Sequence, residues 1–79
     1  MSSLSLGLAY LAAGLGAAGA TIGGGLGIGK LASAAMEGVS RQPEAAGDIR
    51  GMMILTAAMV EGIALFAIVV CILLLFMAK

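Results

Sequence analysis

One acidic side chain stands alone in the most apolar part of the sequence. Glu61 is the only charged residue in the 28-residue run from Gly51 to Ala78. A helix of that length exceeds the roughly 20 residues needed to cross a bilayer. An ionised acid at the centre of such a helix costs about 2.5 to 3.5 kcal/mol, so apolar surroundings favour the neutral, protonated carboxyl. Such a carboxyl can carry a proton; the alternative role is a structural hydrogen bond between helices.

The elements that position this acid must be membrane helices. The chain is 62% hydrophobic and 10% charged, with a mean hydropathy of +1.19, far from the composition of a soluble domain. A second uncharged segment runs from about Leu4 to Ile28. Despite its glycines it should be helical, because backbone in lipid must satisfy its own hydrogen bonds. The sequence therefore predicts two transmembrane helices.

Several function classes are excluded by the same numbers. The net charge is zero, aromatic residues make up 4% and there is no Trp or His, so the chain lacks the basic and stacking surfaces that bind nucleic acid. A chain of 79 residues with four acids and four bases cannot furnish both a core and a catalytic cleft. The lone Cys71 excludes an intramolecular disulfide and a cysteine metal cage. We expect no enzyme activity, no cofactor and no metal.

The turn between the helices is marked by charge and by the only proline. Five of the eight charged residues gather between the apolar segments, at Glu37, Arg41, Glu44, Asp48 and Arg50. Pro43 cannot continue a preceding helix but suits the first turn of a following one. The predicted fold is an all-α antiparallel transmembrane hairpin, a single domain over 1–79, with helices at about 4–40 and 44–78 and a polar loop at 41–43.

The charges also predict an orientation. Lys30, Arg41 and Arg50 lie on the loop side, against Lys79 on the other, and basic residues favour the cytoplasmic side of a membrane. The loop should be cytoplasmic and both termini should lie on the opposite side. No Lys or Arg precedes the first apolar segment, so it lacks the basic region of a signal peptide and is expected to remain in the mature chain.

Glycines alternate along the first helix, at Gly23, Gly25, Gly27 and Gly29. At 100° per residue, Gly23 and Gly27 share one side, and Gly25 and Gly29 lie nearly opposite. A helix with two bare flanks can pack closely against an identical neighbour on each. Such head-to-tail contacts close into rings, so we predict a homo-oligomeric ring with the first helices inside. Ordinary packing between the two helices of one hairpin is the alternative.

The surroundings of Glu61 bear on which ion it binds. A turn at 41–43 makes positions level when their numbers sum to about 85, which places Glu61 opposite 23–25. Its neighbours Gly62, Ile63 and Ile28 have no side-chain oxygen, whereas a hard cation such as sodium wants several oxygen ligands. A proton needs only the carboxyl. We predict proton binding, with the Thr21 and Thr56 hydroxyls the features that keep sodium as an alternative.

Three features together resemble the c subunit of F-type ATP synthase. They are the alternating run Gly23–Gly29, the loop Arg41-Gln42-Pro43-Glu44, and the lone acid Glu61; the similarity covers essentially the whole chain. The resemblance implies a ring of identical c subunits that rotates against the a subunit of the stator. It also implies that Glu61 takes a proton from one half-channel of the stator, crosses the lipid in neutral form, and releases the proton into the other half-channel.

The same resemblance implies further partners and a location. The loop residues Arg41, Gln42 and Pro43 would contact the gamma and epsilon subunits of the central stalk. The chain would serve ATP synthesis without binding nucleotide, most simply in a bacterial inner membrane. Sodium-translocating relatives carry a glutamine on the first helix and hydroxyl residues after the acid, where this chain has Ile28, Gly62 and Ile63. The resemblance thus also favours the proton.

Three other functions fit part of the pattern. One is a sodium-translocating version of the same rotor. A second is a pore-forming or scaffolding hairpin, which would be short, apolar and oligomeric but would not require Glu61. A third is the proteolipid of a vacuolar-type pump, against which the Arg41-Gln42-Pro43 loop argues.

Overall fold

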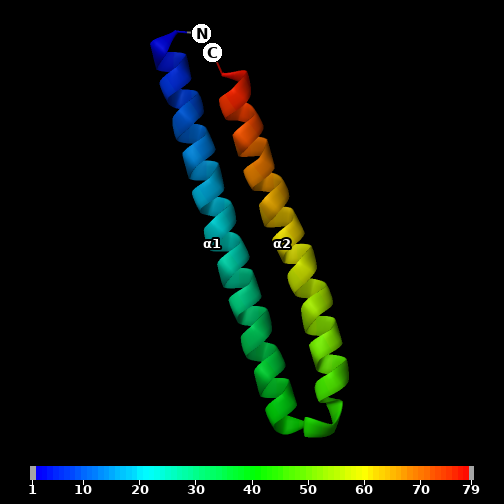
Figure 1. Ribbon diagram of the computed structural model, residues 1–79. Coiled ribbons are helices and arrows are strands. Elements are labelled where there is room, and N and C mark those ends of the chain that lie inside the picture. The colour runs from blue at the N-terminus through cyan, green and yellow to red at the C-terminus, as the bar shows by residue number, and fades with distance from the viewer. Residues whose placement is uncertain (1, 79) are drawn as a thin grey trace.

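The chain forms two long antiparallel helices that lie side by side (Figure 1). The computed structural model describes residues 2–78. Helix α1 spans Ser3–Arg41, a short 3₁₀ turn η1 spans Pro43–Ala45, and helix α2 spans Ala46–Met77. The described chain is a rod of 61 × 15 × 7 Å. The two chain ends lie together at one end of the rod and the turn lies at the other, as Figure 1 shows.

The turn follows from Gln42 and Pro43. Gln42 leaves helical geometry, with φ −133° and ψ 75°, while its N–H donates to the Gly38 carbonyl. Pro43 then opens the 3₁₀ turn, which its missing N–H allows. Because Pro43–Ala45 adopt this tighter geometry, α2 begins at Ala46, two residues after the expected position 44. The Arg41 guanidinium pairs with the Glu37 carboxylate at 2.6 Å in the last turn of α1, where positive charge is favourable.

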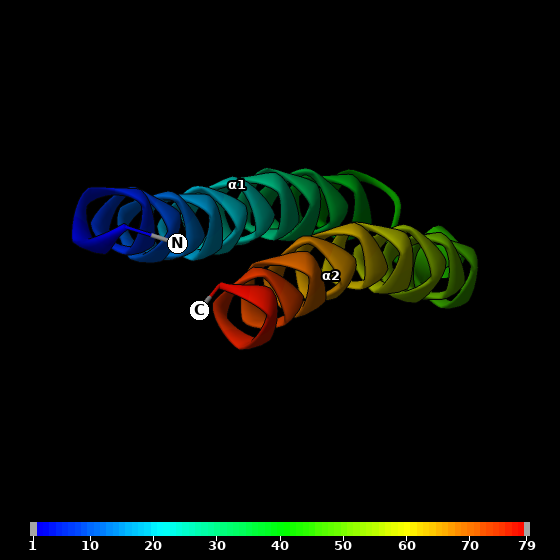
Figure 2. The same ribbon diagram turned by 90° about the horizontal axis from the view of Figure 1, so that it is seen from above.

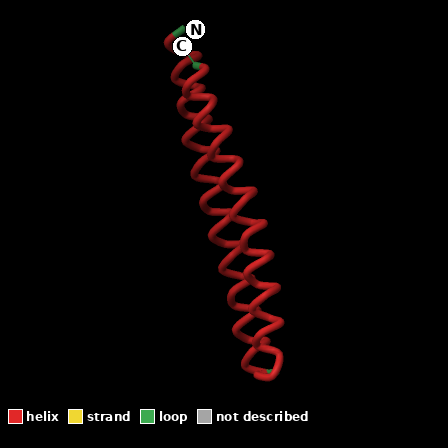
Figure 3. Tube along the Cα trace, turned by 45° about the vertical axis from the view of Figure 1, so that its right-hand side comes forward, coloured by secondary structure: helices red, strands yellow, loops and turns green. Residues whose placement is uncertain are grey.

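Small residues at regular spacing hold the helices together. The less exposed positions recur every three or four residues or at their sum of seven, on α1 at Ala13, Ala20, Gly24, Gly27, Leu31 and Ala35 and on α2 at Ile49, Met53, Val60, Ala64, Ala67 and Cys71. This spacing keeps one stripe of each helix, which we call the contact stripe, facing its partner. Figures 2 and 3 show the result, a single layer two helices wide in the described chain.

Two glycines on this side of α1 allow the closest approach. A Cβ built on Gly24 would lie 3.2 Å from the Ala64 Cβ. A Cβ built on Gly16 would lie only 2.8 Å from the Cys71 Sγ, closer than real Cβ contacts come. Gly16 and Cys71 are therefore a matched pair, one lacking a side chain where the other places its sulfur.

We expect Gly16→Ala to lower the thermal stability of the folded protein, because overpacking a helix contact typically costs about 1–3 kcal/mol. Replacing Cys71 with Ala in the same chain removes the sulfur and should restore most of the loss. Thermal unfolding of the four chains of this double-mutant cycle in detergent checks the coupling. Equal effects of Gly16→Ala with and without Cys71 would contradict the contact.

A single hairpin buries very little. Among residues 2–78, only Ala13, Ala35 and Ala78 are buried, and large apolar side chains such as Leu4, Ile63 and Phe66 are 70–73% exposed. Both arms, Ser3–Arg41 and Pro43–Met77, are long and apolar enough to cross a membrane. Exposed apolar surface of this extent marks a membrane or oligomer surface, so lipid and further protein must cover these faces.

Candidate functional site: the groove of Glu61

Glu61 lies at the midpoint of α2, fifteen residues after Ala46 and sixteen before Met77. Arg50, the last charged residue before it, is eleven residues away, which corresponds to about 16 Å along a helix. A hydrocarbon core is about 30 Å thick. If Arg50 marks the membrane boundary, Glu61 lies about halfway through the apolar layer.

The carboxyl opens into a groove between the helices. The groove has a volume of about 300 Å³ and is lined by Ala20, Thr21, Gly24, Gly25, Ile28, Glu61, Ala64 and Ile68. Glu61 thus lies level with Gly24 and Gly25, as the antiparallel register predicts. Gly24 is needed there because it faces Ala64; the alternating pattern alone did not single it out.

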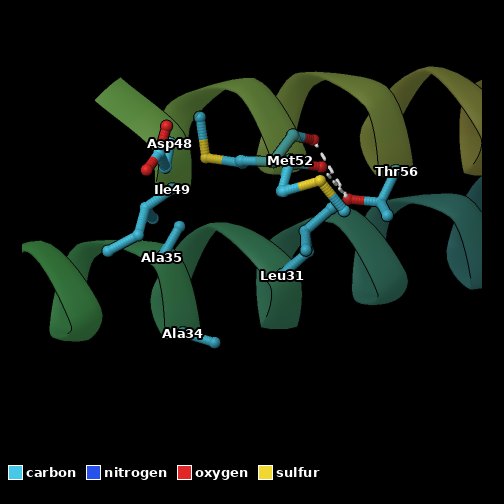
Figure 4. A pocket seen from close by; sticks show the side chains of 8 residues that line it. Leu31, Ala34, Ala35, Asp48, Ile49, Met52 and Thr56 are labelled. Carbon is cyan, nitrogen blue, oxygen red and sulfur yellow. Dashed lines mark hydrogen bonds between the residues drawn. The ribbon is translucent and has the colours of Figure 1, made fainter. Parts of the chain in front are cut away.

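Oxygen ligands are scarce in this groove. Among the described residues, Thr21 is the only hydroxyl residue that lines it, and its Oγ1 donates to the Ala17 carbonyl at 2.8 Å. Thr56 lines another groove, shown in Figure 4, and donates to the Met52 carbonyl at 2.7 Å and the Met53 carbonyl at 3.2 Å. Of the two threonines considered from the sequence, only Thr21 therefore lies at the acid.

No metal centre accompanies the acid in the described part of the chain. Residues 2–78 contain no group of three His, Cys, Asp or Glu side chains that could hold a metal ion. The chemistry available in this groove is therefore that of one carboxyl and one hydroxyl in apolar surroundings.

The hairpin has two different flanks on either side of the contact stripe. The first, which we call the Glu61 flank, carries Glu61 with Thr21 and Gly25. The second, which we call the Ile63 flank, carries Ile63 with Gly23; its groove of about 230 Å³ is lined by Ala20, Gly23, Gly24, Val60, Ile63, Ala64 and Ala67. Within residues 2–78, every side chain that lines the Ile63 flank at this level is apolar.

The alternating glycines divide between these surfaces. Gly23 and Gly25 lie on opposite flanks, and an added Cβ at either meets nothing within 4 Å in the described chain. Gly29 lines a shallow hollow with Lys30 and Ser33, all on α1. Gly27 differs from the expected grouping with Gly23, because its Cβ would lie 3.5 Å from the Val60 Cγ1. Gly27 therefore packs within the hairpin.

The predicted stalk residues lie at the far end of the rod. Arg41, Gln42 and Pro43 are all exposed at the turn, away from the end that holds both termini (Figure 1). The Arg41 side chain is 76% exposed even though it pairs with Glu37. A protein that approaches the tip of the hairpin can therefore reach all three residues.

Comparison with known proteins identifies the family. The family of the ATP synthase C subunit matches residues 4–74. The chain belongs to the ATP synthase c-subunit family. An ATP synthase c subunit from Phocaeicola vulgatus is 60% identical over 96% of this chain and 90% of its own length. That of Bacteroides thetaiotaomicron is 53% identical over 96% and 89%, and that of Synechococcus elongatus is 45% identical over 96% and 94%.

Membership of the ATP synthase c-subunit family fits the observed fold. Members of this family are helical hairpins that form the rotor ring of F-type ATP synthase, and two apolar helices with a hairpin turn are what the structure shows. The c subunit is a component of the complex and not its catalyst. The exposed apolar faces of the single hairpin are the surfaces that a ring and a membrane cover.

Proposed function

We propose that this chain is the proton-carrying component of the rotor ring, with Glu61 as the carrier. The observation that supports this most directly is the groove at Glu61, where a single carboxyl lies midway along a membrane helix among apolar and glycine residues. An ionised acid is costly in such surroundings. Glu61 would therefore cross lipid in its protonated form and lose the proton only beside a cation or water.

The arrangement of the flanks favours a proton over sodium. In a cyclic ring, the same two different surfaces meet at every contact, so the Glu61 flank of one copy would meet the Ile63 flank of the next. That neighbour presents Gly23, Ile63 and Ala67, without a side-chain oxygen. A sodium ion would find the carboxylate and the Thr21 hydroxyl, fewer ligands than a hard cation requires.

The remaining partners follow the resemblance. The a subunit of the stator would exchange protons with Glu61 through two half-channels; the side chain is exposed in the hairpin, so a partner can reach it. Arg41, Gln42 and Pro43 would contact the gamma and epsilon subunits of the central stalk. The relatives are bacterial, which supports the bacterial plasma membrane, and the three basic residues on the loop side support a cytoplasmic loop with both termini opposite. The function needs no cofactor.

We expect a lipid-soluble carbodiimide, which reacts with protonated carboxyls in apolar surroundings, to modify Glu61 selectively in the purified ring. Labelling should slow as pH rises, because the reactive protonated form is depleted. Added sodium should leave the rate unchanged. Mass spectrometry of the intact chain and its fragments measures the extent and the position of modification.

Two internal controls sharpen this labelling experiment. Glu44 lies exposed in the turn and should stay unmodified, and Glu61→Gln should remove labelling altogether. Protection by sodium would replace the proton with sodium in the same rotor. Absence of reaction at Glu61 at every pH would instead support the scaffolding hairpin.

A further inference from the structure

Two opposite charges near the turn end of α2 point away from each other. Asp48 and Arg50 are two residues apart, which places their side chains about 200° apart around a helix. Asp48 lines the groove of Figure 4, with Leu31, Ala34 and Met52. Arg50 lines a separate groove, with Met36 and Val39. Both grooves include Ala35, Ile49 and Met53, so the contact stripe separates the two charges.

Neither charge is neutralised within the hairpin. In residues 2–78, the one ion pair is Arg41 with Glu37 at 2.6 Å, and neither Asp48 nor Arg50 takes part in a side-chain hydrogen bond there. Asp48 lies in the first turn of α2, which accounts for a favourable acid but not for the basic residue beside it. The hairpin thus presents one charge of each sign, on opposite sides, with no partner in the described chain.

The two charges belong to the two flanks already defined. Arg50 and Glu61 are eleven residues apart, close to three full helical turns, so they share a flank. Met52 and Ile63 have the same spacing, and Met52 lines the same groove as Asp48. Arg50 therefore lies on the Glu61 flank, and Asp48 lies on the Ile63 flank.

We propose that Arg50 of each copy forms an ion pair with Asp48 of the next copy around the ring. Head-to-tail contacts bring the Glu61 flank of one hairpin to the Ile63 flank of its neighbour. Copies related by rotation about the ring axis lie at equal heights, so the two residues differ in level by two residues, about 3 Å. That offset is well within reach of an arginine side chain.

The occupant of each groove is thus a second copy of this chain, chosen by charge. The acid has apolar neighbours in Leu31, Met52 and Ala34, which would exclude water once the next copy covers them and would weaken screening of the pair. Complementary charges of this kind fix which surfaces meet more than they add affinity. The pairing rests on the ring that the family forms and is independent of the ion that Glu61 carries.

A charge-reversal experiment tests the pairing between copies. Asp48→Arg places a positive charge on both flanks of a chain, and Arg50→Asp places a negative charge on both. Rings of either variant alone would bring like charges together at every contact. The two variants expressed together would pair opposite charges at each contact by alternating. We expect the yield of intact rings to fall at least tenfold for each variant alone and to recover in the mixture.

The doubly substituted chain Asp48→Arg/Arg50→Asp is the matched control, because it reverses the pair without creating like charges, and it should also assemble. Rings are quantified by electrophoresis in detergent, and differently tagged variants show by co-purification whether mixed rings alternate. Normal ring yield from each single variant would overturn the pairing. So would failure of the mixture to recover when each variant alone is deficient.

Cross-linking gives an independent measurement. In a Cys71→Ala background, Asp48→Cys with Arg50→Cys should form disulfides between copies on oxidation and give a ladder of linked chains. Asp48→Cys with Met52→Cys places both thiols on the Ile63 flank and should give no ladder. Wild-type-sized rings without the 48–50 ladder would overturn the pairing even if proton transport is normal. A ladder in rings that do not transport protons would instead contradict the proposed role of Glu61.

Discussion

Replacing Glu61 with Gln is expected to abolish proton transport through the ring, by at least a hundredfold, while the ring still assembles. The amide has nearly the shape of the acid but cannot release a proton at physiological pH. The side chain is exposed in the hairpin and makes no side-chain hydrogen bond in the described chain, so its loss should not disturb the fold. ATP-driven acidification of membrane vesicles measures transport, and electrophoresis of the purified ring measures assembly.

Two further variants make the result specific to the position of the carboxyl. Glu44→Gln removes an acid in the exposed turn and should change transport less than twofold. Glu61→Asp keeps a titrating group but withdraws it by one methylene, so transport should be reduced without being lost. Unchanged transport in Glu61→Gln would favour the pore-forming or scaffolding function over the proton carrier.

Gly25→Val is expected to block ring assembly while leaving the hairpin folded. A Cβ at Gly25 meets nothing within 4 Å in the described hairpin, so the larger side chain fits a single chain. It would project from the Glu61 flank, where the next copy must approach closely. The yield of intact rings should fall at least tenfold, as measured by electrophoresis in mild detergent and by the size of the purified complex.

Gly23→Val tests the other side of the same contact and should have a comparable effect from the Ile63 flank. Gly7→Val is the matched control, since Gly7 is equally open within the hairpin but lies near the end of α1. Rings of normal size and yield from Gly25→Val would show that neighbouring copies do not meet at this level of α1.

Much of the hairpin was predictable from a few residues. Pro43 placed the turn, and the register that follows from the turn correctly brought Glu61 level with Gly24 and Gly25. The start of α2 was less accurate, because nothing in the sequence distinguishes an α-helical first turn from the 3₁₀ turn over Pro43–Ala45. Level along a hairpin depends on counting residues, which a sequence supplies directly.

The direction in which each side chain points was harder to predict. The 100° step gives angles between residues of one helix, but the side on which the second helix lies depends on packing. Gly27 was therefore grouped with Gly23, although in the folded hairpin it faces Val60. For the same reason the sequence could not tell which threonine lies at Glu61. Both are close in level, but Thr56 lines a different groove.

The depth of Glu61 also determines how the ring would sense voltage. At about 16 Å from Arg50, the acid would divide a hydrocarbon layer of about 30 Å into nearly equal halves. Moving one charge across the whole layer involves about 2.3 kcal/mol per 100 mV, so each half would account for about 1.2 kcal/mol. That is equivalent to a roughly sevenfold change in proton concentration at the acid. Electrical potential and pH difference would then be interchangeable in loading Glu61, with neither face of the membrane favoured.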